Sequence, residues 1–309
     1  MLWVLLALTG AVTNAGYYVT TKKMLQSINP HVLAAGSFLT TALFLLLVSS
    51  HSGIPVIGDR FLFAVSITAS LNIIATLLTY RALATTDISL AVPMISFTPV
   101  FLIGTSFLLL HELPTIGGAI GILIIVSGSY VLNLSPGQKS IADPIRSIAR
   151  HPGVLYMLVV AFLYSITVNF DKMVVQESDT VFGSAILFVV LGSAFVIIAL
   201  FSCLDACTLR WIKKDLPKTT ELKPVFPGFR YRWVAGAFIF IGLLITLEAM
   251  VINYAYTLQI VPYVIAFKRM SIVLTVLIGA IVFRESDLGR RLAGAVLMVL
   301  GAVLILVTL

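Results

Sequence analysis

The sequence has few charged residues. Asp, Glu, Lys and Arg make up 11% of the 309 residues, whereas hydrophobic residues make up 60% and the mean hydropathy is +1.09. An ordinary soluble domain has about 25% charged residues, so that class of protein is excluded. The chain is therefore expected to lie in a membrane.

Cysteine, histidine and catalytic motifs are also scarce. Cys203 and Cys207 are too few for a disulfide framework, and the four histidines, at positions 31, 51, 111 and 151, do not have metal-ligand spacing. There is no Walker-type nucleotide motif, no Ser/His/Asp, His-Glu or paired-carboxylate constellation in the apolar segments, and no basic stretch before the first apolar run. We therefore expect no metal, no cofactor, no enzymatic activity and no cleaved signal peptide.

Ten apolar segments have the length of about 20 residues that is needed to cross a bilayer. Because the backbone in lipid must satisfy its own hydrogen bonds, such runs form helices, and the alternating polar residues of a β-barrel are missing. The sequence therefore predicts an all-α membrane protein. The predicted spans are Leu2–Thr21, Pro30–Ser50, Phe61–Leu83, Ser89–Leu110, Pro114–Leu134, Gly153–Val175, Phe182–Cys203, Trp233–Tyr256, Val261–Phe283 and Leu288–Leu309.

Lysine and arginine are distributed unevenly between the loops. The loops after odd-numbered spans hold sixteen of the twenty basic residues. Without the long loop Asp205–Arg232 they still hold nine, against Arg60 and Lys172 on the opposite face. Because basic loops stay in the cytoplasm, both termini are predicted to lie outside it, in a multi-pass protein of the cytoplasmic membrane. The net charge of +7 follows from this topology and requires no nucleic-acid partner.

The chain contains an internal duplication. Segments that start at Thr98 and at Ser271 share an apolar helix, an acidic residue and a glycine-spaced apolar helix. Five spans per half make the second half inverted relative to the first. The predicted units are a first five-helix repeat at 1–134, a cytoplasmic linker at 135–152, and a second repeat at 153–309 with a long loop at 205–232. The residues that coincide at an offset of 173 are Glu112 with Glu285, Gly121 with Gly294, and Gly128 with Gly301.

These residues resemble the drug/metabolite transporter superfamily, in its EamA branch. The resemblance covers essentially the whole chain and implies ten transmembrane helices in two inverted repeats and a role in transport. It is carried by Pro99, the Glu112-Leu113-Pro114 step, Gly117, Gly118, Gly121 and Gly128, and by the weaker echo at Glu285, Gly294 and Gly301.

A second resemblance concerns Lys268-Arg269, followed by Ser271 and Ile272 in the ninth predicted span. This step is similar to the Lys-Arg pair of phosphate translocators in the same superfamily. The resemblance implies that the two basic side chains bind an anionic group.

Glu248, Lys268 and Arg269 are predicted to lie inside the membrane. An ionised residue at a helix centre costs about 2.5–3.5 kcal/mol, so each requires a partner, a wet cavity or a ligand. At a rise of about 1.5 Å per residue, Glu248 and Lys268 have similar depths and can pair. A buried ion pair that only joins two helices is one interpretation. Unless Asp171 or Glu177 reaches in, however, one cation remains for an anionic ligand, and Arg269 can bind a carboxylate or phosphate bidentately.

Polar residues on other spans are candidates for the same cavity. For a single Ser or Thr, an interhelical hydrogen bond worth about 0.6 kcal/mol is the simpler role. Asn14 and Asn72 are better candidates, because a primary amide has four hydrogen-bonding sites and lipid satisfies none. The predicted substrate-binding residues are Lys268, Arg269, Glu248, Asn14, Asn72, Tyr17, Thr98, Tyr164 and Asn169, with Tyr18, Ser96, Asn253 and Tyr254 as further cavity candidates.

The sequence therefore predicts a secondary transporter for a small polar metabolite, anionic or zwitterionic, driven by a gradient or by exchange. The alternative is a flippase for a lipid-linked phosphate or glycan-phosphate. Expected partners are the substrate and membrane lipids. Gly117 and Gly121 form a small-xxx-small face, which is typical of close helix packing or of a contact in a homodimer.

Overall fold

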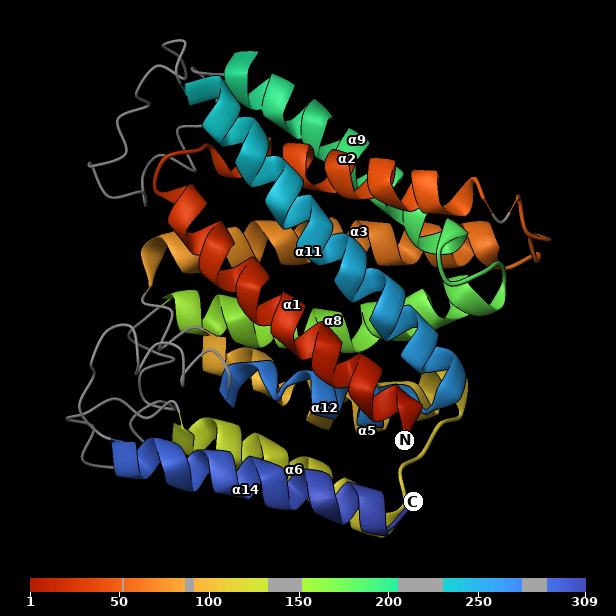
Figure 1. The fold of residues 1–309 in the computed structure, drawn as a ribbon, viewed down its shortest axis with the longest axis vertical. Helices are drawn as coiled ribbons and strands as arrows, with labels where there is room; N and C mark the ends of the chain where they lie inside the picture. The colour runs from red at the N-terminus through yellow and green to blue at the C-terminus, as the bar shows by residue number, and fades with distance from the viewer. Residues whose placement is uncertain (52, 87–91, 133–151, 205–229, 274–287) are drawn as a thin grey trace.

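The computed structural model describes all residues except 52, 87–91, 133–151, 205–229 and 274–287. Within these residues the chain is helical throughout, with no strand, as predicted. Figure 1 shows the helices stacked across the molecule, with both termini at the same end. The elements are α1 (Leu2–Leu25), α2 (Pro30–Ser49), α3 (Phe61–Thr85), the 3₁₀ helix η1 (Val92–Phe97), α5 (Thr98–Leu110), α6 (Ile116–Leu132), α8 (Pro152–Gln176), α9 (Phe182–Leu204), α11 (Arg230–Leu258), α12 (Val261–Lys268) and α14 (Leu288–Val307).

Six of these helices are long and apolar enough to cross a membrane, namely α1, α2, α3, α8, α9 and α11. Several of their ends are marked by the sequence. Asn29 caps α2 by accepting a hydrogen bond from the His31 N–H at 2.9 Å, and Asp179 caps α9 by accepting from Val181 and Phe182 at 2.6 Å each. The count of ten spans stays a prediction, because the ninth is described only as far as Val273.

The fourth and ninth predicted spans are not continuous helices in the described residues, in contrast to the prediction. In the fourth, η1 precedes α5, and Pro99 in the first turn of α5 lacks the N–H that would continue the bonding pattern. In the ninth, α12 ends at Lys268 and Arg269 is its C-cap. The Met270 N–H bonds to the Phe267 carbonyl, three residues back, at 2.9 Å. Neither Gly nor Pro lies at this second break, so no sequence signal marks it.

The pairing of the helices is the same when each helix is replaced by its counterpart in the other half of the chain. Helix α6 packs along α14 and α2 along α9, which joins corresponding members of the two halves. Helix α3 packs along α8, and the exchanged pair, α11 with α1, also packs. Two inverted repeats would give this arrangement; the duplication itself stays a prediction.

Helices α6 and α14 approach each other through glycines. A Cβ added to Gly121 would lie 2.7 Å from the Gly301 carbonyl oxygen, and one added to Gly128 would lie 2.7 Å from the Gly294 carbonyl oxygen. The earlier glycine of α6 thus faces the later glycine of α14, because the two helices run in opposite directions (Figure 1). A Cβ on Gly117 would meet Thr308, the residue that follows α14. Of the two predicted uses of this face, the structure therefore shows close packing within the chain.

We expect Gly121→Ala to destabilise the protein by about 1–3 kcal/mol, because the new methyl group would force two backbones apart. The measurement is thermal unfolding of the purified protein in detergent. Gly104→Ala in α5 is the matched control, since nothing lies within 4 Å of its added Cβ. Equal stability of the two variants would contradict the close approach.

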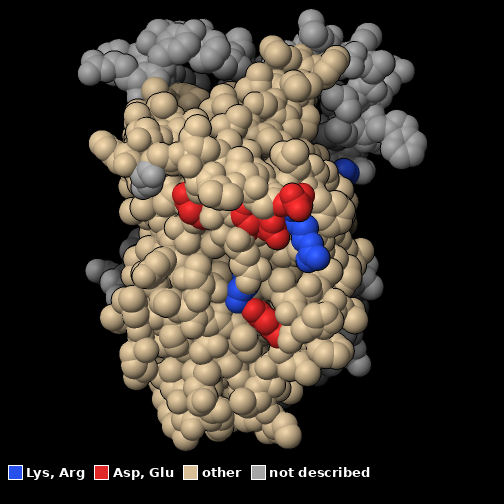
Figure 2. Space-filling view, turned by 90° about the vertical axis from the view of Figure 1, so that its right-hand side faces the viewer, with Lys and Arg blue, Asp and Glu red and all other residues tan. Residues whose placement is uncertain are grey.

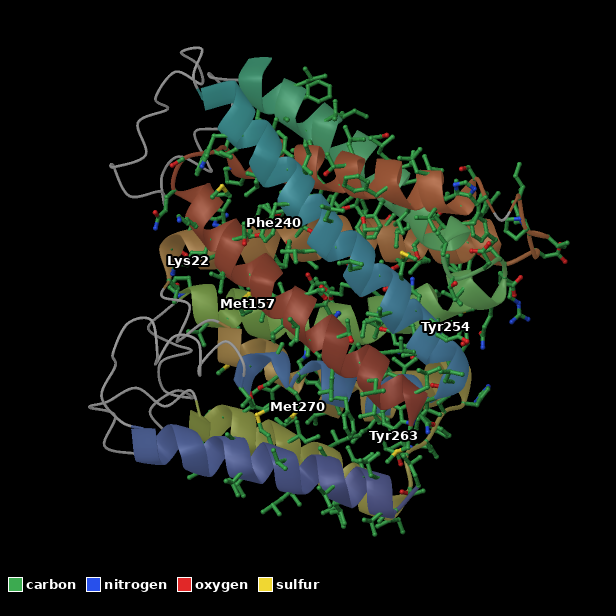
Figure 3. The ribbon with its side chains drawn as sticks, viewed as in Figure 1. Lys22, Met157, Phe240, Tyr254, Tyr263 and Met270 are labelled. Carbon is green, nitrogen blue, oxygen red and sulfur yellow. The ribbon has the colours of Figure 1, made fainter. Side chains whose placement is uncertain are left out.

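Few charged side chains are visible at the end of the bundle that carries the termini (Figure 2). The end that carries the termini shows only a small group of acidic and basic side chains across its middle (Figure 2). Lys22, in the last turn of α1, lies at the opposite end (Figure 3). This opposite end is the one that the basic loops predict to be cytoplasmic.

Candidate functional site

A polar cavity of about 190 Å³ lies between seven of the helices: α1, α2, α3, α8, α9, α11 and α12. Segments more than 200 residues apart, such as Asn14 and Glu248, therefore share one wall. Seven of the nine predicted site residues line it: Lys268, Arg269, Glu248, Asn14, Asn72, Tyr17 and Tyr164. The wall also holds Tyr18, Asn253 and Tyr256, and the rings of Phe38 and Phe188, so it is both polar and aromatic.

Lys268 and Glu248 form the ion pair that their similar depth predicted. The Lys268 Nζ lies 2.5 Å from Glu248 Oε1, and both side chains are largely buried. Asn14 donates to both oxygens of the same carboxylate, at 3.0 and 3.2 Å. This joins α1, α11 and α12 around one carboxylate and compensates the charge of Lys268.

Arg269 is buried without an ion-pair partner in the described part of the chain. The residue is 4% exposed, and its guanidinium donates to the Thr98 hydroxyl at 2.9 Å. Its Nε has no hydrogen-bond partner among the described residues. Thr98 begins α5 and donates in turn to the Ile95 carbonyl at 2.7 Å. The contact therefore joins the two breaks in the central helices, and Thr98 supports Arg269 from behind the cavity wall.

Asp171 is a cavity residue that the sequence suggested only as a partner for the basic pair. It lies on the cavity wall, but its carboxylate accepts a hydrogen bond from the Thr68 hydroxyl at 2.6 Å. Asn72 donates to the same hydroxyl at 3.1 Å and holds it in place. The other suggested partner, Glu177, lies outside the cavity and accepts from the Arg60 N–H at 3.3 Å.

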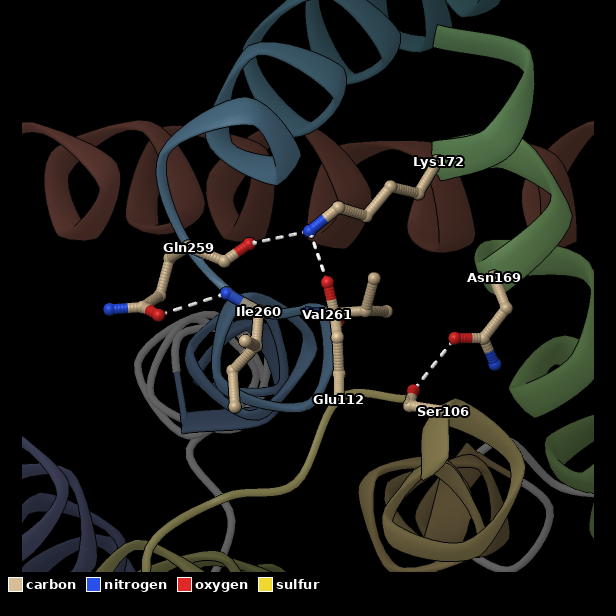
Figure 4. A network of polar contacts seen from close by, with 7 residues as sticks. All are labelled: Ser106, Glu112, Asn169, Lys172, Gln259, Ile260 and Val261. Carbon is tan, nitrogen blue, oxygen red and sulfur yellow. Dashed lines mark hydrogen bonds and ion pairs between the residues drawn. The ribbon is translucent and has the colours of Figure 1, made fainter. Parts of the chain in front are cut away.

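The remaining predicted residues lie elsewhere. Asn169 is fully buried, but the Ser106 hydroxyl donates to its Oδ1 at 2.7 Å, so it joins α8 to α5 (Figure 4). Asn169 thus forms an interhelical hydrogen bond, which is the alternative role to substrate binding. Ser96 is buried away from the cavity, and Tyr254 is 46% exposed at the outer surface. Asn169 therefore does not line the cavity, in contrast to the prediction.

Lys172 is not a loop residue, in contrast to the prediction. It lies in α8 with 7% exposure, and its Nζ is 2.5 Å from Glu112 Oε1 and 3.2 Å from the Gln259 carbonyl oxygen. Glu112 Oε2 accepts from the Val261 N–H at 2.9 Å (Figure 4). One ion pair thus joins the start of α12, the α5–α6 connection and α8 at the end that carries the termini. The count of basic residues treated Lys172 as a loop residue because it lies near the end of a long apolar run, although the predicted span Gly153–Val175 contains it.

Some predictions fall outside the described residues. These are Glu285, Cys207, nearly all of the predicted linker at 135–152, and most of the loop at 205–232. In the described residues, no group of three or more His, Cys, Asp or Glu side chains could hold a metal ion.

Comparison with known proteins identifies the first half of the chain. Residues 1–134 match the model of the EamA-like transporter family, which belongs to the drug/metabolite transporter superfamily. No curated protein matches. A solved structure, described only as the crystal structure of a protein, is similar in fold, with a TM-score of 0.72 and 15% identity over 99% of this chain and 97% of that one.

Proposed function

We propose that this protein is a secondary carrier for a small polar metabolite with a carboxylate or phosphate group. The premise is that this multi-pass membrane protein is a transporter of the drug/metabolite type. The anionic group binds Arg269. Energy comes from a gradient or from exchange, because the sequence has no Walker-type motif.

The observation that carries this proposal is the state of Arg269. Among the described residues, Arg269 makes its hydrogen bond to a neutral hydroxyl, which is costly for a buried cation. A guanidinium that meets a carboxylate or phosphate instead forms strong, bidentate hydrogen bonds. Arg269 lies on the wall of a cavity and not in a closed ion pair. An anionic ligand would supply the charge that it lacks.

The size of the cavity favours a metabolite over the alternative substrate. Pockets for drug-sized ligands are about 300–1,000 Å³. A volume of about 190 Å³ fits a smaller molecule and leaves little room for a glycan-phosphate headgroup. We therefore favour transport of a small metabolite over flipping of a lipid-linked substrate.

We expect Arg269→Gln to weaken anion binding about 100-fold, because the anionic group would lose its charged partner in a buried site. The fold should survive, since Lys268 keeps its pair with Glu248. The measurement is a thermal-shift and binding screen of purified protein with sugar phosphates, nucleotide-sugars, amino acids and organic acids.

The matched control for this substitution is Arg60→Gln, which removes a basic side chain from an exposed position. It should bind the same ligands as the unmodified protein. Unchanged ligand binding by Arg269→Gln would refute the proposed site.

We also propose that both termini lie outside the cytoplasm, in the cytoplasmic membrane. The structure moves Lys172 from the outer loops into the protein interior, which makes the charge asymmetry of the loops larger. A reporter enzyme fused after Leu309 should therefore be active only when it acts outside the cytoplasm. A fusion within the turn between α1 and α2 should show the reverse. Cytoplasmic activity of the C-terminal fusion would show that the charge rule fails for this chain.

A further inference from the structure

Four side chains of Asp, Glu, Lys and Arg line the cavity, and their formal charges sum to zero. Glu248 and Lys268 form an ion pair, so their charges compensate each other directly. The other two, Asp171 and Arg269, lie on the same cavity wall, and neither has an ion-pair partner in the described ranges. The protein thus offers one anion and one cation whose described partners are neutral hydroxyls.

Each of these two side chains is held by a hydroxyl from a neighbouring helix. Thr68 of α3 donates to Asp171, and Thr98 of α5 accepts from Arg269. Asn72 fixes Thr68 by donating to its oxygen at 3.1 Å. Both charged groups lie in the second half of the chain, Asp171 on α8 and Arg269 at the end of α12, and hydroxyls from the first half hold them in position before any ligand arrives.

The wall also holds an acceptor that has no donor. The Oδ1 of Asn14 is buried and has no hydrogen-bond partner among the described residues. Its orientation is not arbitrary, because the Nδ2 of the same amide donates to Glu248. Such an unsatisfied acceptor costs free energy unless a ligand donates to it.

We propose that Asp171 is the group that recognises a positively charged part of the substrate, so that the carrier transports small zwitterions. This inference rests on the proposed function, in which Arg269 binds the anionic group. An ammonium group has three N–H donors and can bind the Asp171 carboxylate, with Asn14 as a further acceptor. The substrate class is therefore a compact molecule with one ammonium group and one carboxylate or phosphate.

The balance of charge favours a zwitterion over a simple anion. A monoanion bound at Arg269 would leave Asp171 uncompensated and give the cavity a net negative charge. A zwitterion places an opposite charge on each unpaired group and keeps the sum at zero. Because a net charge in a buried site of low dielectric is unfavourable, a zwitterion should bind more tightly than the same molecule without its ammonium group.

Two matched pairs of probes test this inference on the full-length protein. One is leucine with 4-methylpentanoate, and the other is phosphoethanolamine with ethyl phosphate; in each pair only the first molecule carries an ammonium group. We expect the unmodified protein to bind at least one zwitterion about 10-fold or more tightly than its partner. Asp171→Asn should remove this preference, because it should weaken binding of the zwitterion and leave binding of the molecule without the ammonium group unchanged or tighter.

A second variant allows the inference to be tested even if Asp171→Asn does not fold. Thr68→Val keeps the carboxylate but removes the hydroxyl that positions it, so it should reduce the preference in the same direction. Arg269→Gln should weaken binding of both molecules of a pair. This result distinguishes the proposed anion site at Arg269 from the proposed recognition of the ammonium group by Asp171. If Arg269→Gln changes nothing, the proposed function fails.

The zwitterion inference alone fails if Arg269→Gln acts as expected while Asp171→Asn weakens both members of a pair equally. It also fails if the unmodified protein binds neither zwitterion or prefers the simple anions. If Asp171→Asn changes no affinity but removes the pH dependence of transport, Asp171 carries a proton and does not recognise the substrate.

Discussion

Glu112→Ala is expected to lower the free energy of unfolding by about 3–5 kcal/mol, because it would leave the buried Lys172 ammonium without its carboxylate. The Val261 N–H at the start of α12 would lose its acceptor as well. The loss should appear in thermal or chemical unfolding of the detergent-purified protein.

Glu177→Ala is the matched control, since it removes a carboxylate at the same end that accepts a hydrogen bond from the exposed backbone N–H of Arg60. It should cost less than about 1 kcal/mol. Replacing both partners, as Glu112→Leu with Lys172→Met, should recover part of the lost stability. A Glu112→Ala variant as stable as Glu177→Ala would mean that the pair contributes nothing to the fold.

Glu248→Gln should have a comparable effect in the absence of ligand, about 3 kcal/mol or more. The substitution keeps a side chain that Asn14 can contact but leaves Lys268 and Arg269 as two cations with only Asp171 in the cavity. An anion that supplies the missing charge should then bind more tightly and raise the unfolding temperature more than it does for the unmodified protein.

The control for this second substitution is the double variant Glu248→Gln with Lys268→Met, in which the unpaired cation is removed. It should regain stability and lose the increased response to anions. If Glu248→Gln is as stable as the unmodified protein and responds equally to anions, the Glu248–Lys268 pair determines neither the fold nor the charge of the cavity.

The sequence predicted the helices well because hydropathy and turn residues are local signals. Most of the helix ends lie within a few residues of the predicted ones. The pairing of Lys268 with Glu248 was also predictable, since two neighbouring spans place these residues at one depth. Such arguments need only the length of each span and the rise per residue.

What the sequence could not give is the direction in which each side chain points. On α8, Tyr164, Val168 and Asp171 recur at helical spacing and share the cavity face, whereas Asn169 lies on another face and contacts α5. Applying this spacing to the polar residues of the span would have exchanged Asn169 for Asp171. The break at Arg269 has no such signal, because it depends on contacts with a helix 171 residues away.

The glycine contact between α6 and α14 has a consequence for how such carriers diversify. The glycines by which the chain resembles the EamA branch, Gly117, Gly118, Gly121 and Gly128, lie on α6. None of the described cavity-lining residues comes from α5, α6 or α14. Under the proposed function, the residues that determine selectivity therefore lie on other helices than the glycines of the scaffold. Substitutions on the cavity wall can change the cargo while the glycine helices keep the architecture, so two chains with the same motif can carry unrelated molecules.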